Sequence, residues 1–489
     1  MKNSIRIGWA SVEITPQRPF FLIGQMYYRV CRYVHDPLTA TALALDNGSD
    51  QAVIVSCDMP GIGAELLRRL KEELDGYNGL DANRITVGAT HTHTSSTFLN
   101  DDLRDRFVAV AGEDKALAME VPDNIIQGKE LTDFWVGRVS QMIREAWDGR
   151  KPGGISFAHD YAAVAFNRRP VFRNPDGSEY SKMYGACSLD NFVRFEGPSD
   201  HSADMVYTWS PDGKLTGVMV NIPCPSQIME LHYFASADYW HYARKHIRAK
   251  LDSNVFILPV CGAAGDQNPI DLIRVSKVNE KELIDWNAQA GEVWCNYDLG
   301  EECDATGERI ADAVVRGYSR ARNEIRPDLD LRHEVIEISL PLRTIEEKDY
   351  LDARHKIDEY LKQFSPKHRM ASENQVALFD FLGYIERWEA QNKSKQFRFP
   401  SHIIRLGTAA FVTVPFELFV DYAFRVKARC KADQVFFQQL SNSAGGYLPT
   451  VAAVNGGSYS SKPTSTNVGP EGGDKLSEIL ISEIDKLMK

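Results

Sequence analysis

The segment "AVIVSCDMPGIGAELLRRLKEELDGYNGLDANRITVGATHTHT", residues 52–94, contains the clearest pattern of secondary structure in this chain. It opens with a short apolar run over 52–58, continues with an amphipathic segment over 65–77, and closes with a second apolar run that begins at 84. Short β-branched runs are typical of buried strands, and the middle segment has helical periodicity. This strand–helix–strand pattern predicts an α/β fold whose chemistry lies in the loops after the strands.

The same pattern returns twice further along the chain. We expect a strand over 215–223, a helix over 238–251 and, over 255–269, a strand that runs into a glycine-rich turn. Two short strands are expected within 402–417, then a helix over 418–429, a strand over 434–442 and a closing helix over 475–489. No internal sequence repeat and no interdomain linker is evident, so the sequence predicts a single large α/β domain over residues 1–489. Insertions near 98–130 and 345–395, the second with two helices, are expected to act as lids or pocket walls.

Composition narrows the class of protein. The chain has 489 residues, of which 43% are hydrophobic and 25% charged, as in soluble globular proteins. Its net charge of -11 argues against nucleic acids and anionic membranes as partners, and no apolar run is long enough for a membrane span. The first residues show no signal peptide and the cysteines are scattered, so we expect a reduced, cytoplasmic location. A periplasmic or secreted location stays open if the sequence has been trimmed.

Several polar residues follow the expected strands. His91 and His93 are two positions apart, so in an extended strand both imidazoles point to one side, as metal ligands, an acid–base pair or two hydrogen-bonded side chains. Glu417, at the end of an apolar run, is either a helix-start charge or a ligand. Tyr447 lies in a glycine-rich loop, and Cys224 lies between two prolines, where most cysteines are buried and inert.

Six motifs of this chain, taken in their order along the sequence, resemble those of a known protein family. "IRIGWASVEITP" (5–16), "THTH" (90–93), "GAAGDQNP" (262–269), "VPFE" (414–417), "GGYLPT" (445–450) and "STNVGPEGG" (465–473) together resemble the catalytic domain of the neutral, non-lysosomal ceramidases. More specifically, the chain is similar to bacterial ceramidase-like proteins of unassigned activity. The resemblance runs from about residue 4 to the end and implies mixed sheets flanked by helices, without the family's C-terminal β domain. It implies a zinc site that includes His91, Glu417 and Tyr447, with His93 as a neighbour that positions a reacting group or donates a proton.

Two motifs depart from the family. Where the family has its other histidine ligand in an "HP" pair, this chain has Cys224, and zinc accepts thiolate as readily as imidazole. His232 is the alternative ligand. Where the family has its catalytic serine in "GDxSP", this chain has Asn268, so true ceramidase activity is not expected. A zinc-activated water can replace the serine, with Asn268 stabilising the oxyanion and Asp266 or His93 moving the proton.

The sequence therefore predicts a zinc-dependent hydrolase that cleaves an amide or related bond in a small polar or sugar-like molecule. Zinc is favoured among divalent metals by the mixed ligand set. A ligand-binding protein without turnover and a metal-assisted carbohydrate-active enzyme are the alternatives, and the oligomeric state is left open. The expected metal ligands are His91, Cys224, Glu417 and Tyr447; the catalytic residues His93, Asp266 and Asn268; and the substrate-binding residues Asn167, Arg168, Arg169 and His201.

Overall fold

The strand–helix–strand unit predicted over 52–94 is present in the structure, a computed structural model. Strand β6 (Gln51–Cys57) leads through α1 (Ala64–Leu74) and the short 3-10 turn η1 (Ala82–Arg84) into β7 (Ile85–Ala89). The two strands are parallel, with Val53 opposite Ile85 and Cys57 opposite Ala89. The structure describes residues 4–27, 29–99, 108–110, 112, 121–277, 283–287, 292–295, 299–365, 367–368 and 375–489.

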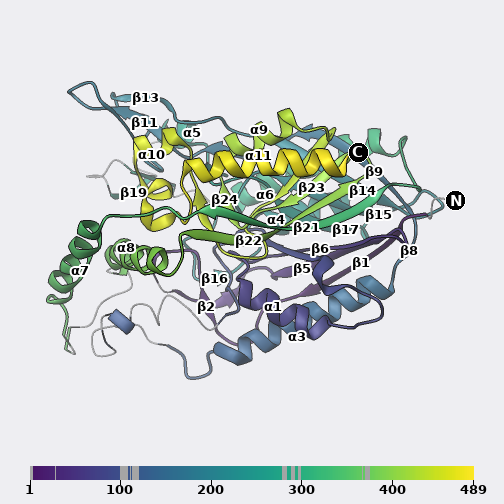
Figure 1. Cartoon of the computed structure of the whole chain (residues 1–489), viewed down its shortest axis with the longest axis horizontal. Coiled ribbons are helices and arrows are strands. Elements are labelled where there is room, and N and C mark those ends of the chain that lie inside the picture. The colour runs from purple at the N-terminus through teal and green to yellow at the C-terminus, as the bar shows by residue number, and fades with distance from the viewer. Residues whose placement is uncertain are drawn as a thin grey trace.

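Within these residues, three sheets repeat one topology (Figure 1). In each, three antiparallel strands are followed by a helical crossover to a fourth strand that is parallel to the third. The first has the order β7, β6, β5 (Thr39–Asp46), β1 (Arg6–Glu13), with β8 (Lys151–Pro152) at its edge. The second has β17 (Phe256–Cys261), β15 (Leu215–Ile222), β14 (Ser202–Trp209) and β9 (Gly154–Tyr161); the third has β25 (Gln434–Gln438), β23 (Ala409–Thr413), β22 (Gln396–Leu406) and β21 (Leu331–Pro341).

The three sheets meet in a shared core, which explains why so many strands are apolar throughout. Alternate residues of each strand enter this core, and their neighbours face the helices outside. In β6, for example, Ile54 faces the other sheets and Val53 and Val55 face α1. The shared core contains Ile7, Leu43, Leu45 and Ile54 of the first sheet, Ile155, Val206, Met219, Leu258 and Val260 of the second, and Leu331, Ile404, Leu406, Phe411 and Phe436 of the third.

A pair of helices covers the outer face of each sheet. The first sheet packs on α1 and α3 (Gly128–Asp148), which lie along the lower edge of the view in Figure 1. The second packs on α4 (Tyr239–Lys250) and α6 (Leu299–Ala321), and the third on α9 (Val420–Arg429) and α11 (Pro470–Leu487). Burial on both faces is typical of sheets with parallel crossovers. The predicted mixed-sheet α/β fold is therefore confirmed.

Shorter strands and turns connect the elements of these sheets. The three-stranded sheet consists of β12 (Glu179–Ser181), β11 (Pro170–Arg173) and β13 (Phe192–Phe195). The pairs are β2 (Phe21–Leu22) with β3 (Arg29–Val30), β4 (Tyr33–Val34) with β16 (Phe234–Ala235), β10 (Phe166–Asn167) with β18 (Gln267–Asn268), β19 (Leu283–Asn287) with β20 (Glu292–Cys295), and β24 (Phe416–Leu418) with β26 (Gly446–Leu448). The remaining helical pieces are α5 (Leu272–Lys277), α10 (Val451–Gly456), η3 (Tyr459–Ser461) and η4 (Pro463–Ser465).

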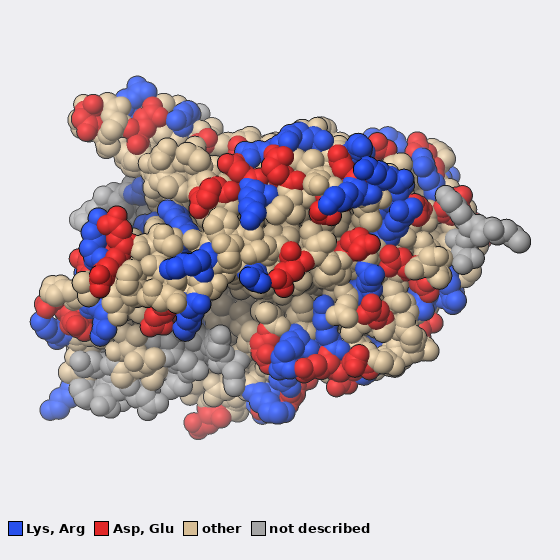
Figure 2. Space-filling view, viewed as in Figure 1, with Lys and Arg blue, Asp and Glu red and all other residues tan. Residues whose placement is uncertain are grey.

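The two predicted insertions differ in what the structure describes. The segment 345–395 holds two helices as predicted, α7 (Glu347–Leu361) and α8 (Gln375–Lys393). Most of 98–130 lies outside the described residues. In the described part of the chain, no helix is both long and apolar enough to cross a membrane. Lys and Arg are interspersed with Asp and Glu over the face seen in Figure 2, without a large patch of one sign.

Candidate active site

A cavity of about 570 Å³ opens where loops from the carboxyl ends of strands in the three sheets come together. His91 follows β7, Glu230 follows β15, Glu417 lies just after β23, and Tyr447 follows β25. Each of these strands belongs to a parallel pair, and the carboxyl ends of such pairs are where α/β folds place ligands. The lining consists of Gly24, Gln25, Met26, Tyr27, Pro60, His91, His93, Arg168, Met183, Tyr184, Gln227, Glu230, Leu231, Val376, Asp380, Glu417, Tyr447, Ser458, Tyr459 and Lys462.

The backbone fixes the direction of the His91 ring. His91 has a φ of 63°, a left-handed conformation that a non-glycine residue adopts only when its surroundings impose it. Its N–H donates to Met59 O at 2.9 Å, and its ring Nδ1 lies 2.5 Å from Pro60 O. A carbonyl oxygen can only accept, so Nδ1 carries the proton and donates. Nε2, the other ring nitrogen, is turned toward the cavity.

Glu417 faces that nitrogen. The parallel pairing of β24 with β26 sets Glu417 directly opposite Tyr447. Its Oε2 lies 3.2 Å from His91 Nε2, and Nε2 is buried with no hydrogen-bond partner among the described residues. Burial by itself raises the pKa of Glu417, but the neighbouring His91 and Arg168 outweigh it and hold the pKa of this carboxyl below its usual value. A ring nitrogen and an ionised carboxylate, each able to bind a cation, therefore face each other at 3.2 Å.

Arg168 and Tyr447 complete this side of the cavity. The Arg168 guanidinium donates to Tyr447 Oη at 3.0 Å and to Gly265 O at 3.0 Å. It also lies over the rings of Tyr447 and Tyr184, 5.5 and 5.9 Å from their centroids. Burial raises the pKa of Tyr447 far above its usual value, so the phenol keeps its proton in the absence of a cation. Arg168, predicted to bind substrate, is thus a wall residue beside Glu417.

His93 and Glu230 form a second histidine–carboxylate pair. Glu230 Oε2 lies 3.0 Å from His93 Nδ1 and accepts from Gln25 Nε2 at 3.0 Å, while Gln227 lies 2.8 Å from His93 Nε2. Burial lowers the pKa of His93. Burial also raises the pKa of Glu230, but the bond to His93 and the charges of Arg168 and Arg29 together hold it below its usual value. The pair is therefore a neutral imidazole donating to an ionised carboxylate, whose Oε1 has no partner among the described residues.

Two residues of the N-terminal loop hold this pair in place. Arg29 is fully buried and donates to the carbonyl oxygens of Glu230, His232 and His93 at 2.6–2.7 Å. Gly24 passes so close to the His93 ring that a Cβ there would lie 2.3 Å from its Cγ, so a side chain at this position would displace the ring. Sequence reasoning did not single out Glu230, Gln227 or Arg29, because nothing in their local pattern shows that their loops converge.

Cys224 does not reach the cavity, and its prediction as a metal ligand needs correction. Its thiol is fully buried in the core of the second sheet and donates to Val164 O at 3.2 Å. Burial raises the pKa of this thiol well above its usual value, which opposes the thiolate that a metal would need. The alternative, His232, stacks on Phe234 with ring centroids 4.7 Å apart and does not line the cavity either.

Asp266 and Asn268 lie behind the wall instead of in the cavity. The Asp266 carboxylate accepts from Val420 N at the start of α9 (3.1 Å) and from Asn167 Nδ2 (3.0 Å), and burial raises its pKa to about 7. Asn268 is fully buried, and its amide donates to Tyr184 Oη at 2.7 Å. Both residues therefore support wall elements, α9 and Tyr184, in place of the predicted direct roles.

The remaining predicted substrate-binding residues are also structural neighbours of the wall. Asn167 holds Asp266, as described above. Arg169 is fully buried, pairs with Glu196 at 2.8 Å and donates to Ala453 O and Gly457 O at 3.2 and 2.5 Å. The ring of His201 packs against Phe166, with centroids 5.4 Å apart. Of the four, only Arg168 lines the cavity.

The donors at His91 fit a metal ion. Two ligands about 2.0 Å from a tetrahedral zinc lie about 3.3 Å apart, close to the separation of His91 Nε2 and Glu417 Oε2. Tyr447 Oη is the third oxygen or nitrogen donor on this wall. In the described part of the chain, no three His, Cys, Asp or Glu side chains come close enough to hold one ion. A site here therefore depends on the tyrosine and keeps open positions, as catalytic zinc sites do.

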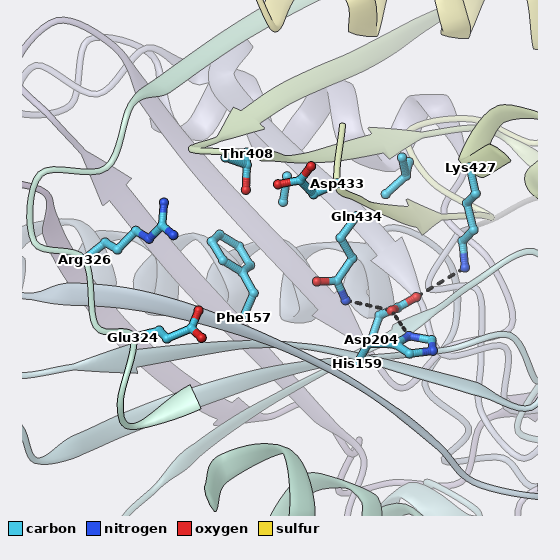
Figure 3. A pocket seen from close by; sticks show the side chains of 11 residues that line it. Phe157, His159, Asp204, Glu324, Arg326, Thr408, Lys427, Asp433 and Gln434 are labelled. Carbon is cyan, nitrogen blue, oxygen red and sulfur yellow. Dashed lines mark hydrogen bonds and ion pairs between the residues drawn. The ribbon is translucent and has the colours of Figure 1, made fainter. Parts of the chain in front are cut away.

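A second cavity of about 470 Å³ lies between the second and third sheets, where residues of β9 and β14 face residues of β25 (Figure 3). Three donors converge there on the buried Asp204 carboxylate: His159 Nδ1 at 2.7 Å, Gln434 Nε2 at 2.7 Å and Lys427 Nζ at 3.2 Å. The bond to Asp204 raises the pKa of His159, whose side chain is 45% exposed. Because Asp204 already accepts from three donors, we interpret this cluster as a hydrogen-bond network that stabilises the fold.

Comparison with solved structures identifies the fold. No protein-family model and no curated protein sequence matches the chain. Among solved structures, neutral ceramidase from Pseudomonas aeruginosa superposes with a TM-score of 0.65 at 15% identity, over 100% of this chain and 75% of that one. A ceramidase in complex with C2 gives 0.64 at 14% identity, over 99% and 75%. The resemblance read from the sequence is thereby confirmed at the level of structure, and the chain has the neutral ceramidase-like α/β fold.

Proposed function

We propose that this protein is a zinc-dependent hydrolase that cleaves an amide or related bond in a small polar or sugar-like molecule. The observation that carries the proposal is the buried Nε2 of His91, which has no hydrogen-bond partner among the described residues and faces Glu417 at 3.2 Å. An unpaired buried nitrogen beside a carboxylate is costly unless a cation lies between them. The fold supports the proposal, because the two solved structures described above that share it are ceramidases.

His91, Glu417 and Tyr447 would hold the metal. When bound there, zinc supplies a Lewis acid and lowers the pKa of a bound water to about 7. Arg168 lies beside Tyr447 and Glu417, so its guanidinium is placed to hydrogen-bond the carbonyl oxygen as negative charge develops on it. Tyr184, fixed by Asn268, closes the same wall.

The proton transfers fall to Glu230 and His93. The Glu230 carboxylate lines the cavity, so it can take a proton from the attacking water and return it to the leaving nitrogen. His93 donates from Nδ1 to Glu230 Oε2 and keeps the carboxylate oriented. This assignment replaces Asp266, which is bonded to α9 and Asn167 outside the cavity.

A ligand-binding protein without turnover is the second candidate. The observation in its favour is that Asn268, where the family has its serine nucleophile, is fully buried and engaged with Tyr184. On that alternative the cavity binds a small molecule and no bond is cleaved.

Elemental analysis of the purified protein tests the proposal. We expect near-stoichiometric zinc in the natural protein and in Cys224→Ser, and none in His91→Ala. His159→Ala, which removes a histidine from the other cavity, is the matched control and keeps its zinc. A folded natural protein that binds no zinc from solution overturns the proposal. Zinc-loaded protein that releases no amine or acid from a panel of small amides favours the binding protein.

A further inference from the structure

The mouth of the cavity carries an ion pair of its own. Lys462 Nζ lies 2.7 Å from Asp380 Oδ2, and both side chains line the cavity. Their side chains are 41% and 37% exposed, against 8% and 13% for His91 and Glu417. The charged groups are therefore arranged in two tiers, with the candidate metal site at the floor and the Asp380–Lys462 pair at the entrance.

The backbone segments that carry Asp380 and Lys462 are held in place by contacts other than this ion pair. On the Lys462 side, Arg169 donates to Gly457 O at 2.5 Å, and Arg343 donates to Ser461 O at 2.7 Å. On the Asp380 side, α8 packs directly on η4: a Cβ on Gly383 would lie 2.6 Å from Thr464 Cβ, and Arg387 donates to Pro463 O at 3.4 Å. The ion pair is consequently free to exchange partners with a ligand.

From this arrangement we propose that the Asp380–Lys462 pair is the subsite for a zwitterionic head group, an ammonium and a carboxylate on one carbon. Such a head group gives each member of the pair a counter-charge: its ammonium meets Asp380 and its carboxylate meets Lys462. A ligand with one charge leaves one side chain at the mouth without a partner, which costs binding energy. The substrate class is therefore an amide formed on the side chain of an α-amino acid.

This inference rests on the proposed function for the position of the cleaved bond. The amide would lie at the floor near His91 and Glu417 while the amino-acid head group stays at the mouth. Water adds its oxygen to the carbonyl carbon, the C–N bond breaks, and the leaving nitrogen takes a proton, so an acid and an amine are formed. A cavity of about 570 Å³ is within the range of sites for small ligands.

Four acetamides that differ only in their charged end test the subsite. They are Nε-acetyl-L-lysine (both charges), N-acetylcadaverine (ammonium only), 6-acetamidohexanoate (carboxylate only) and N-pentylacetamide (neutral). Binding to the full-length protein is measured by calorimetry, and hydrolysis by the acetate released. We expect Nε-acetyl-L-lysine to bind at least about tenfold more tightly than each of the other three.

Single variants separate the two charges. Asp380→Asn should reduce the affinity for Nε-acetyl-L-lysine to that for 6-acetamidohexanoate, and Lys462→Met should reduce it to that for N-acetylcadaverine. The matched control is Lys486→Met, which breaks an exposed pair with Glu483 on α11 and should change none of the affinities.

The possible results distinguish this subsite from the hydrolase proposal. Equal binding of all four compounds overturns the subsite, and so does an equal loss for all four in either variant, which would show a purely structural role. Acetate release without preference for the zwitterion overturns the subsite and leaves the hydrolase standing. Selective binding of Nε-acetyl-L-lysine without acetate release supports the subsite and counts against the hydrolase.

Discussion

Two polar cavities of similar size, about 570 and 470 Å³, differ in the hydrogen-bond partners of their buried carboxylates. In the first, Glu417 faces a ring nitrogen of His91 that has no hydrogen-bond partner among the described residues. In the second, Asp204 accepts from His159, Gln434 and Lys427 (Figure 3). Most buried polar groups in folded chains are paired, so an unpaired nitrogen that lines a cavity is a candidate ligand site and a saturated carboxylate is a candidate stabilising contact.

Replacing Glu417 should give the largest functional effect. In Glu417→Ala the metal loses a charged ligand, and we expect zinc to be lost and turnover to fall by more than about 100-fold. Stability against urea should fall as well, because the bound zinc no longer stabilises the fold and the buried Arg168 loses a counter-charge. Elemental analysis, a turnover assay and urea unfolding measure the three quantities. Retention of zinc by this variant would show that the two cavities do not differ as described.

Replacing Asp204 should lower the stability of the protein and leave the proposed metal site unaffected. Asp204→Asn removes the charge on which His159, Gln434 and Lys427 converge, and we expect the free energy of unfolding to fall by about 2 kcal/mol. Zinc content and turnover should stay at the level of the natural protein. A urea unfolding curve at constant pH gives the stability. A loss of zinc together with stability would mean that the second cavity also serves the metal site.

Replacing Asn268 should have a smaller effect and reveals its role. Asn268→Ala removes the amide that donates to Tyr184 Oη at 2.7 Å, so we expect about 1 kcal/mol of destabilisation and a raised KM, with zinc unchanged. Steady-state kinetics separate KM from kcat. A selective fall in kcat at unchanged KM would instead restore the direct oxyanion role predicted from the sequence.

The smallest effect is on the pH dependence of stability. The Asp204 carboxylate raises the pKa of His159 in the folded protein, so this contact stabilises fully below the unfolded pKa and its contribution is lost as pH rises through the folded value. Because the His159 side chain is 45% exposed, we expect less than about 1 kcal/mol. Urea unfolding of the natural protein and of His159→Gln, at a series of pH values through the titration of His159, measures this contribution. The difference in free energy of unfolding between the two proteins should shrink as pH rises. A difference that grows with pH contradicts the assignment.

Much of the fold could be predicted because the signals are local. The segment 52–94 shows its strand, helix and strand through residue spacing alone, and each occurs where expected. The predicted helices over 238–251 and 418–429 are α4 and α9. The threefold repetition of sheet topology could not be seen, because the three units share strand order and burial and no recognisable sequence pattern. Buried faces need only apolar residues at alternate positions, which many sequences supply.

The candidate site was predicted less completely, because side-chain direction after a strand end depends on backbone torsions. His91 points into the cavity through its left-handed φ, which no spacing rule anticipates. Cys224 occupies the expected loop, yet its thiol turns to Val164 in the core. The same loop brings in Glu230 six positions later. Arg168 and Arg169 are adjacent, but one reaches Tyr447 and the other ties down the loop that ends at Gly457.

The cavity wall is drawn from nearly the whole chain, since it includes Gly24 at one end and Lys462 at the other. During synthesis the ribosome releases the N-terminal portion first, and domains begin to fold as they emerge. A nascent chain that has reached Glu417 still lacks Tyr447 and the loop that carries Lys462. The proposed metal site is therefore complete only after Tyr447 has been synthesised, and a chain that stops before it lacks one of the three proposed ligands.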